Sequence, residues 1–189
     1  MDRKAQILES AQILFAQFGL KKVSTDDIAR EAGISKATLY KYFRNKTEVF
    51  NEIIDKEAGQ LLQAIEEAVS TQSDSVEQLR AHLLTRLTRV DDFVNFYRVT
   101  QDSWGNYWPH IVRVRQRFLK CEQTVVENIL RRGVTSGEFE IEDTTRTALV
   151  LVLALASVEY QWPADEHGLR LPQLVDLMLG MMVNGIRRR

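Results

Sequence analysis

Apolar residues recur at helical spacing along most of the chain. Near the start, Ile7, Ala11, Leu14 and Phe18 lie three or four positions apart, and Gly19 follows them. This spacing predicts a helix over about 3–18 that glycine ends. Similar stripes and caps predict further helices over about 24–32, 35–43, 45–69, 76–90, 93–104, 109–132, 144–162 and 172–186, with Gly133 as the stop of the 109–132 helix. No segment alternates as a strand does, so we expect an all-α fold of about nine helices.

The stretch VSTDDIAREAGISKATLYKYFRNK, residues 23–46, predicts two short helices joined by a tight turn. Ser24 with Asp27 forms a capping box for the first helix, and Gly33 suits its end. Ser35 caps the second helix, where Leu39 and Phe43 are four positions apart and therefore share its inward face. The opposite face carries cations, a tyrosine and a methyl group. These are groups with which a helix contacts DNA in the major groove.

This segment resembles the DNA-binding motif of the TetR family of bacterial transcriptional repressors. The matching residues are Ile28-Ala29, Ala32-Gly33-Ile34-Ser35, Thr38-Leu39-Tyr40, Tyr42-Phe43 and Asn45-Lys46. The match covers roughly the first quarter of the chain, and the remainder resembles the family only in length and helical pattern. The resemblance implies an N-terminal three-helix domain with a helix-turn-helix, over residues 1–47, and a C-terminal helical bundle for ligand binding and dimerisation, over residues 48–189.

Ten residues are the candidate DNA contacts. Lys36 and Lys41 can reach phosphates or guanine edges, Ala37 allows close approach, and the tyrosine hydroxyls can donate to phosphate oxygens. The resemblance implies that Lys46 anchors a phosphate. The full set is Ser24, Thr25, Ser35, Lys36, Ala37, Thr38, Tyr40, Lys41, Tyr42 and Lys46. The alternative is a solvated basic helix face in a helical hairpin.

Composition and charge agree with a DNA-binding protein of the cytoplasm. The chain has 189 residues and a net charge of −1, with 44% hydrophobic and 27% charged residues. Residues 1–47 nevertheless hold nine Lys and Arg against five Asp and Glu, a balance of +4. A positive end on an otherwise acidic chain suits a polyanionic partner. The single cysteine, Cys121, rules out an internal disulfide, and no apolar run reaches the length of a membrane span.

A second group of residues is aromatic. The resemblance implies a small-molecule pocket in the C-terminal helices, and tryptophan and tyrosine suit such a pocket because they combine an apolar face with one polar atom. The candidate ligand-binding residues are Phe96, Tyr97, Trp104, Trp108, Phe118, Cys121 and Tyr160. The alternative for each aromatic residue is a place in the hydrophobic core.

The run ALVLVLALAS, residues 148–157, is apolar on every side, so the helix that contains it must be buried all round. Burial in a subunit interface with the methionine-rich last helix is the favoured interpretation. The resemblance implies the same homodimer, which also suits a pseudo-palindromic operator. The candidate interface residues are Leu151, Leu153, Leu155, Val158, Val175, Met178 and Met182.

Catalysis finds little support in the sequence. The three histidines are scattered without metal-binding spacing, and no glycine-rich phosphate loop is present. We therefore expect no enzyme activity, no metal and no cofactor. The predicted function is a cytoplasmic transcriptional repressor that a small-molecule effector releases from double-stranded DNA. Two alternatives remain: a TetR-shaped DNA binder that a protein partner controls or that organises the chromosome, and an all-α enzyme or carrier.

Overall fold

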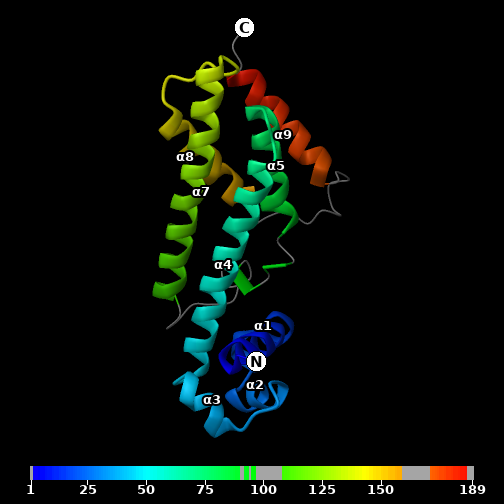
Figure 1. Cartoon of the computed structure of the whole chain (residues 1–189), viewed down its shortest axis with the longest axis vertical. Helices are drawn as coiled ribbons and strands as arrows, with labels where there is room; N and C mark the ends of the chain where they lie inside the picture. Colours follow the sequence, from blue (N-terminus) through cyan, green and yellow to red (C-terminus); the bar gives the residue numbers. More distant parts are fainter. Residues whose placement is uncertain (1, 90–91, 94, 97–107, 159–170, 187–189) are drawn as a thin grey trace. The chain divides into compact units, whose positions relative to one another are not determined.

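The computed structural model describes residues 2–89, 92–93, 95–96, 108–158 and 171–186. Within these ranges the chain forms eight helices and no strand (Figure 1), so the predicted all-α fold is confirmed. None of the helices in the described ranges is both long and apolar enough to span a bilayer. The helix predicted over 93–104 and the end of the one predicted to reach residue 162 lie largely outside the described residues.

Two compact units divide the chain. The first comprises residues 1–59 and 92–115, and the second comprises residues 60–91 and 116–189. Two long helices contribute to both units: α4 (Lys46–Ser70) and α7 (Trp108–Ser136). The division predicted from the sequence, at residues 47 and 48, stays a prediction.

The first unit is built on α1 (Arg3–Lys22), α2 (Thr25–Glu31), α3 (Lys36–Tyr42) and the start of α4. Its core consists of fully buried apolar side chains, and the rings of Phe15 and Phe50 meet edge to face with centroids 5.3 Å apart. The regular dihedral angles of α1 break at Gly19, whose φ of 75° suits only glycine. The predicted end of the helix at Gly19 is therefore too early, because α1 continues to Lys22, although its helical dihedral angles do break at Gly19.

The second unit contains the rest of α4 and α7, together with α5 (Ser75–Thr88), α8 (Thr144–Val158) and α9 (Leu171–Ile186). Asp143 caps α8, because its side chain accepts a hydrogen bond from the backbone N–H of Arg146 at 2.9 Å. Helices α5 and α9 pack together, and an ion pair of 3.0 Å joins Arg80 to Asp176.

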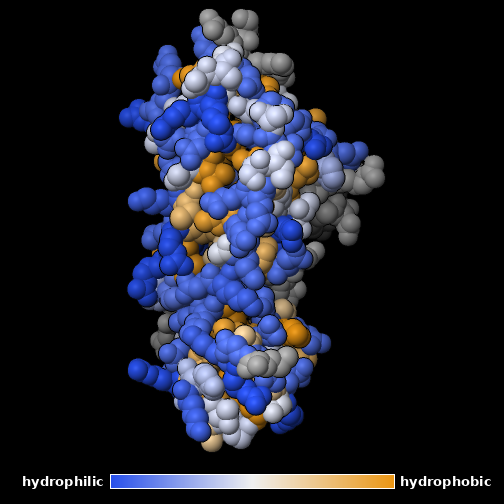
Figure 2. Space-filling view, viewed as in Figure 1, coloured by the Kyte–Doolittle hydropathy of each residue, from blue (hydrophilic) through white to orange (hydrophobic). Residues whose placement is uncertain are grey.

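Hydrophilic residues cover most of the face drawn in Figure 2, with apolar residues showing between them.

The prediction that Gly133 stops α7 is wrong, since the helix continues to Ser136. The residue in the left-handed conformation that ends it is Gly137, with φ of 79°. Gly133 instead allows the ring of Phe139 to approach the helix, because a Cβ atom at Gly133 would overlap the Phe139 Cδ2 atom. Phe139 is buried, so this glycine is required for packing rather than for helix termination.

We expect Gly133→Ala to lower the free energy of unfolding by about 1–3 kcal/mol, because the added methyl group overlaps the Phe139 ring. Gly59→Ala is the matched control. A Cβ atom at Gly59 meets nothing within 4 Å, so alanine there should stabilise α4 by up to about 1 kcal/mol. Chemical denaturation of both variants provides the measurement. Equal stability of Gly133→Ala and the unmodified chain would contradict this account of the Phe139 packing.

Candidate DNA-binding interface

Local hydrogen bonds fix the boundaries of α2 and α3. Ser24 Oγ accepts the backbone N–H of Asp27 at 3.1 Å, while the Asp27 carboxylate accepts the backbone N–H of Ser24 at 3.0 Å. This is the predicted capping box. The hydrogen bonds with Ser24 hold the pKa of Asp27 below its usual value. Ser35 caps α3 by accepting the backbone N–H of Thr38 at 3.1 Å, and Gly33 takes a φ of 60° in the turn between the helices.

The orientation of α3 depends on two buried side chains. Leu39 and Phe43 are almost completely inaccessible, as the sequence spacing predicts. The ammonium group of Lys4 lies 5.6 Å from the centre of the Phe43 ring. Gln6 of α1 also donates a hydrogen bond of 2.8 Å to the carbonyl oxygen of Ala32, just before the turn. These contacts hold one side of α3 against the core of the first unit.

The outward side of α3 is the recognition face, which we define as Lys36, Ala37, Tyr40 and Lys41. All four residues are exposed, and Tyr40 is 47% accessible. The Tyr40 hydroxyl lies 3.4 Å from Thr25 Oγ1 of α2, so the start of α2 borders this face. A short helix that presents cations, a phenol hydroxyl and a methyl group has the chemistry needed to read a major groove.

Two of the predicted lysines already have partners in the DNA-free chain. Lys36 Nζ lies 2.8 Å from the carboxylate of Asp26, and this hydrogen bond raises the pKa of Lys36. Lys46 Nζ donates to the carbonyl oxygens of Leu20 and Val23 at 2.9 and 2.8 Å. These carbonyls lie at the C-terminal end of α1, where cations are favoured. The ammonium group of Lys46 thereby ties the start of α4 to the end of α1.

The other predicted DNA contacts divide by exposure. Tyr42 is exposed at the end of α3, whereas Thr25 and Thr38 are half-buried. Ser24 and Ser35 are exposed but use their hydroxyl groups as helix caps. All ten predicted DNA contacts belong to the first unit. Their contacts with DNA stay a prediction.

A buried carboxylate joins α1 and α4 to a third segment of the first unit. Glu57 is fully buried and accepts hydrogen bonds from the side chains of Gln12 and Asn95 at 2.9 and 2.8 Å. It also accepts the backbone N–H of Phe96 at 2.7 Å. Burial raises the pKa of Glu57, and these hydrogen bonds oppose that effect. The only sign of this role in the sequence is a charged residue beside the apolar stripe of α4.

The predicted ligand-binding residues are only partly described. Tyr97, Trp104 and Tyr160 lie outside the described residues, and so does the side chain of Trp108. Phe96 is buried in the first unit, while Phe118 is buried and Cys121 half-buried in the second. Among the residues that the structure describes, no group of three His, Cys, Asp or Glu side chains could hold a metal ion.

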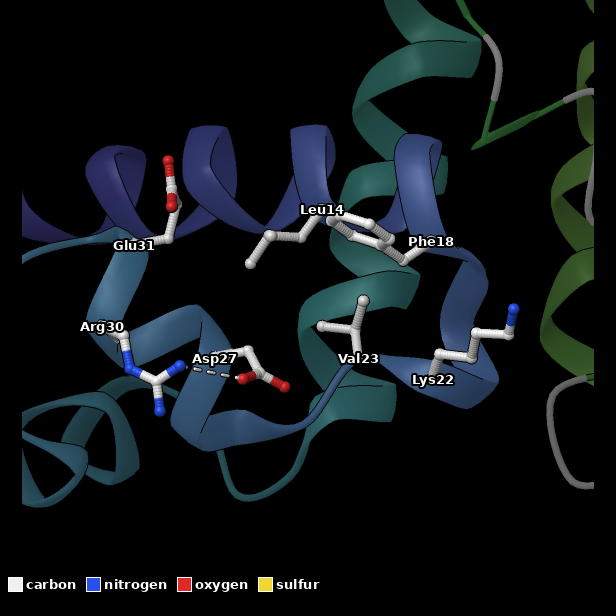
Figure 3. A pocket seen from close by; sticks show the side chains of 7 residues that line it. All are labelled: Leu14, Phe18, Lys22, Val23, Asp27, Arg30 and Glu31. Carbon is white, nitrogen blue, oxygen red and sulfur yellow. Dashed lines mark hydrogen bonds and ion pairs between the residues drawn. The ribbon is translucent and has the colours of Figure 1, made fainter.

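A shallow pocket lies between α1 and α2 of the first unit (Figure 3). Leu14, Phe18 and Val23 form its apolar side, and the ion pair between Arg30 and Asp27, 3.4 Å long, lies on its other side. None of the predicted ligand-binding residues lines this pocket. It is therefore a feature of the helix-turn-helix region rather than the aromatic pocket predicted from the sequence.

The predicted dimer-interface residues differ in exposure. Leu155 and Val175 are buried within the single chain, at 1% and 0% accessibility. Leu151, Met178 and Met182 are half-buried, Leu153 is exposed, and the side chain of Val158 lies outside the described residues. Each of α8 and α9 also carries large exposed apolar side chains that the prediction did not name, among them Val150, Leu177 and Met181.

Comparison with known proteins identifies the family. Residues 7–53 match the profile of the bacterial regulatory proteins of the tetR family. The uncharacterised helix-turn-helix transcriptional regulator YfiR of Bacillus subtilis is 30% identical over 147 residues, which are 73% of this chain and 68% of YfiR. The chain belongs to the TetR family of bacterial regulators. It is a DNA-binding transcriptional regulator, as the helix-turn-helix residues predict.

Two further comparisons span nearly the whole chain. The transcriptional repressor KstR2 of Rhodococcus jostii is 25% identical over 190 residues, covering 97% of this chain and 91% of KstR2. The crystal structure of the transcriptional regulator FadR from Bacillus subtilis in complex with stearoyl-CoA superposes with a TM-score of 0.74. That match has 23% identity and covers 97% of this chain and 99% of FadR, so it shows the shared fold.

Lys41→Ala tests the recognition face of this regulator. We expect weaker binding to all DNA sequences alike, with the slope of log affinity against log salt concentration reduced by roughly one unit, because one phosphate contact is lost. Lys120→Ala, an equal change of charge at an exposed position on α7, should leave the slope unchanged. Fluorescence anisotropy over a range of salt concentrations provides the measurement. An altered preference at a single base pair would assign Lys41 to base reading instead.

Lys46→Met separates a structural role from phosphate binding. The variant keeps the aliphatic stem but leaves the α1 carbonyls without their charged donor. We expect the free energy of unfolding to fall by about 1 kcal/mol. For a chain of this size, this corresponds to a decrease of roughly 2–4 °C in melting temperature. Calorimetry of the DNA-free protein measures this loss. An unchanged melting temperature together with a reduced salt slope would instead assign Lys46 to phosphate alone.

Proposed function

We propose that this regulator is a homodimeric repressor that an apolar small molecule releases from its operator. The observation that carries the DNA-binding part is the exposed recognition face on a helix whose other side is held by Leu39 and Phe43. Two such faces, one from each protomer, would enter major grooves of a pseudo-palindromic site about 34–36 Å apart. The site of action would be the cytoplasm, where the bacterial chromosome lies. The proposal assigns the chain no catalytic step.

The exposed apolar residues of α8 and α9 support the dimer. Val150 is 63% accessible, Leu177 is 55% accessible and Met181 is 78% accessible. Leu177 and Met181 are four positions apart, so they share one face of α9. Large apolar side chains that are exposed on one helix face are costly to leave in water and typically mark an interaction surface. Two helices from each protomer would make a four-helix contact.

The relatives support an apolar effector and repression. FadR of Bacillus subtilis was crystallised with stearoyl-CoA, a molecule with a long apolar chain, and KstR2 is named a repressor. The second unit of this chain has an apolar interior formed by α5, α7, α8 and α9. An effector that binds one conformation of this unit more tightly would shift the population away from the one that fits DNA. Release of the operator follows from that shift.

The function is tested on a DNA site selected from random sequences. We expect stearoyl-CoA or another apolar compound of a screening set to weaken binding to that site at least about tenfold, equivalent to about 1.4 kcal/mol. Free coenzyme A is the matched control, because it carries the same charged groups without the acyl chain. If no compound changes DNA affinity, control by a protein partner becomes the better account of this regulator.

Met181→Glu tests the dimer. The side chain is exposed in the single chain, so the charge should not disturb folding, but burial of an unpaired carboxylate in the interface would be unfavourable. We expect a folded monomer in analytical ultracentrifugation, with the circular dichroism spectrum of the unmodified chain. Val134→Glu, at an exposed apolar position on α7, should remain dimeric. Retention of the dimer by Met181→Glu would exclude this face of α9 as the interface.

A further inference from the structure

Three charged or titratable side chains lie in the apolar interior of the second unit. His82 and Arg86 of α5 and Glu122 of α7 are all buried, at 2%, 1% and 1% accessibility. Their neighbours along the two helices are apolar: Leu83 and Leu87 on α5, and Phe118 and Val126 on α7. Ionised groups are rarely buried this deeply unless they are paired or hydrogen-bonded, because the loss of hydration is costly.

The two partners of Glu122 both use the same oxygen atom. His82 Nε2 and Arg86 Nε each lie 3.0 Å from Glu122 Oε1. Both contacts are therefore made to Glu122 Oε1, and neither reaches Glu122 Oε2. The guanidinium carbon of Arg86 lies 4.8 Å from the centre of the Phe118 ring, a cation–π contact.

Glu122 Oε2 is buried and has no hydrogen-bond partner among the residues that the structure describes. Burial would raise the pKa of Glu122, but the hydrogen bond from His82 and the charge of Arg86 outweigh it and lower the pKa. The carboxylate is therefore ionised at neutral pH. A buried anionic oxygen without a donor loses its hydration and gains nothing in return, so it needs a group that donates a hydrogen bond.

We propose that Glu122 Oε2 is the polar contact for the effector, and that the effector is an apolar molecule carrying a neutral hydroxyl group, an alcohol or a phenol. This inference rests on the proposed function and narrows the class of ligand. The buried oxygen selects a donor and disfavours a carboxylate. Arg86 already balances the charge of Glu122, so a second cation is not required. The surrounding leucine, valine and phenylalanine side chains select an apolar body for the ligand.

The position of Glu122 also gives the ligand a means of acting on the fold. Glu122 joins α7 to α5 through two residues one helical turn apart, His82 and Arg86. A hydroxyl group that donates to Oε2 would draw negative charge of the carboxylate toward that oxygen. The hydrogen bonds that His82 and Arg86 make with Oε1 would then weaken. Occupation of the site would thereby change the preferred spacing of α5 and α7 within the second unit.

A pair of probes isolates the donated hydrogen bond. Decan-1-ol and 1-methoxydecane have the same alkyl chain, but only the alcohol has an O–H group. We expect the unmodified protein to bind the alcohol at least about tenfold more tightly than the ether, measured by isothermal titration calorimetry, because the ether leaves the buried acceptor unsatisfied. This comparison requires no mutation, so it does not depend on how a variant folds.

Glu122→Gln then assigns the preference to this residue. Its amide group can keep an oxygen toward His82 and Arg86 while presenting an N–H donor where Oε2 lay. The preference for alcohol over ether should fall to within about twofold, or reverse. Glu140→Gln, the same substitution at an exposed position, should retain the preference of the unmodified chain.

Three results would overturn the inference: equal binding of alcohol and ether to the unmodified protein, no binding of either, or an unchanged preference in a folded Glu122→Gln variant. Release from DNA is measured separately on the selected operator. If other apolar compounds release DNA while Glu122→Gln has no effect on their binding, the inference fails and the proposed function stands. If the alcohol binds through Glu122 but DNA is not released, the site stands and the proposed function fails.

Discussion

The burial of Leu39 and Phe43 is the constraint on which DNA recognition in this regulator depends. A helix of seven residues such as α3 is unstable alone in water, so tertiary packing must hold it in place. These two side chains give that packing, and their position determines which residues of α3 face outward. The capping hydrogen bonds of Ser24 and Ser35 set the residues at which α2 and α3 begin. Together with the buried side chains, they determine which residues of α3 belong to the recognition face and that this face points outward.

Two buried glutamates show how differently a charged group can be used inside one fold. Glu57 uses both carboxylate oxygens, and its donors come from α1 and from residues 95 and 96, so it stabilises the first unit. Glu122 has two donors on one oxygen and none on the other among the described residues. The first arrangement is complete as a structural element. The second requires a further donor, and that requirement links the interior of the second unit to a ligand.

The amino-acid pattern predicted much of the helical framework and the whole recognition face, because local signals determine both. The capping box at Ser24, the glycine at position 33 and the four-residue spacing of Leu39 and Phe43 act within one or two helical turns. Contacts between distant segments were not predictable in the same way. The sequence predicts a helix stop at Gly133 because nothing in it indicates that Phe139 packs against this residue. Glu122 lies on the stripe with Phe118 and Val126, and this spacing was the available signal for a buried acid.

The central claim is that the exposed side of α3 reads DNA while Leu39 and Phe43 hold its other side in the core. A crystal structure of the regulator bound to its selected operator tests this claim most directly. The account predicts that Lys36, Ala37, Tyr40 and Lys41 of each protomer lie in the major groove, with the two α3 helices one turn of DNA apart. A complex in which α3 points away from the DNA, or in which another element occupies the groove, would contradict it.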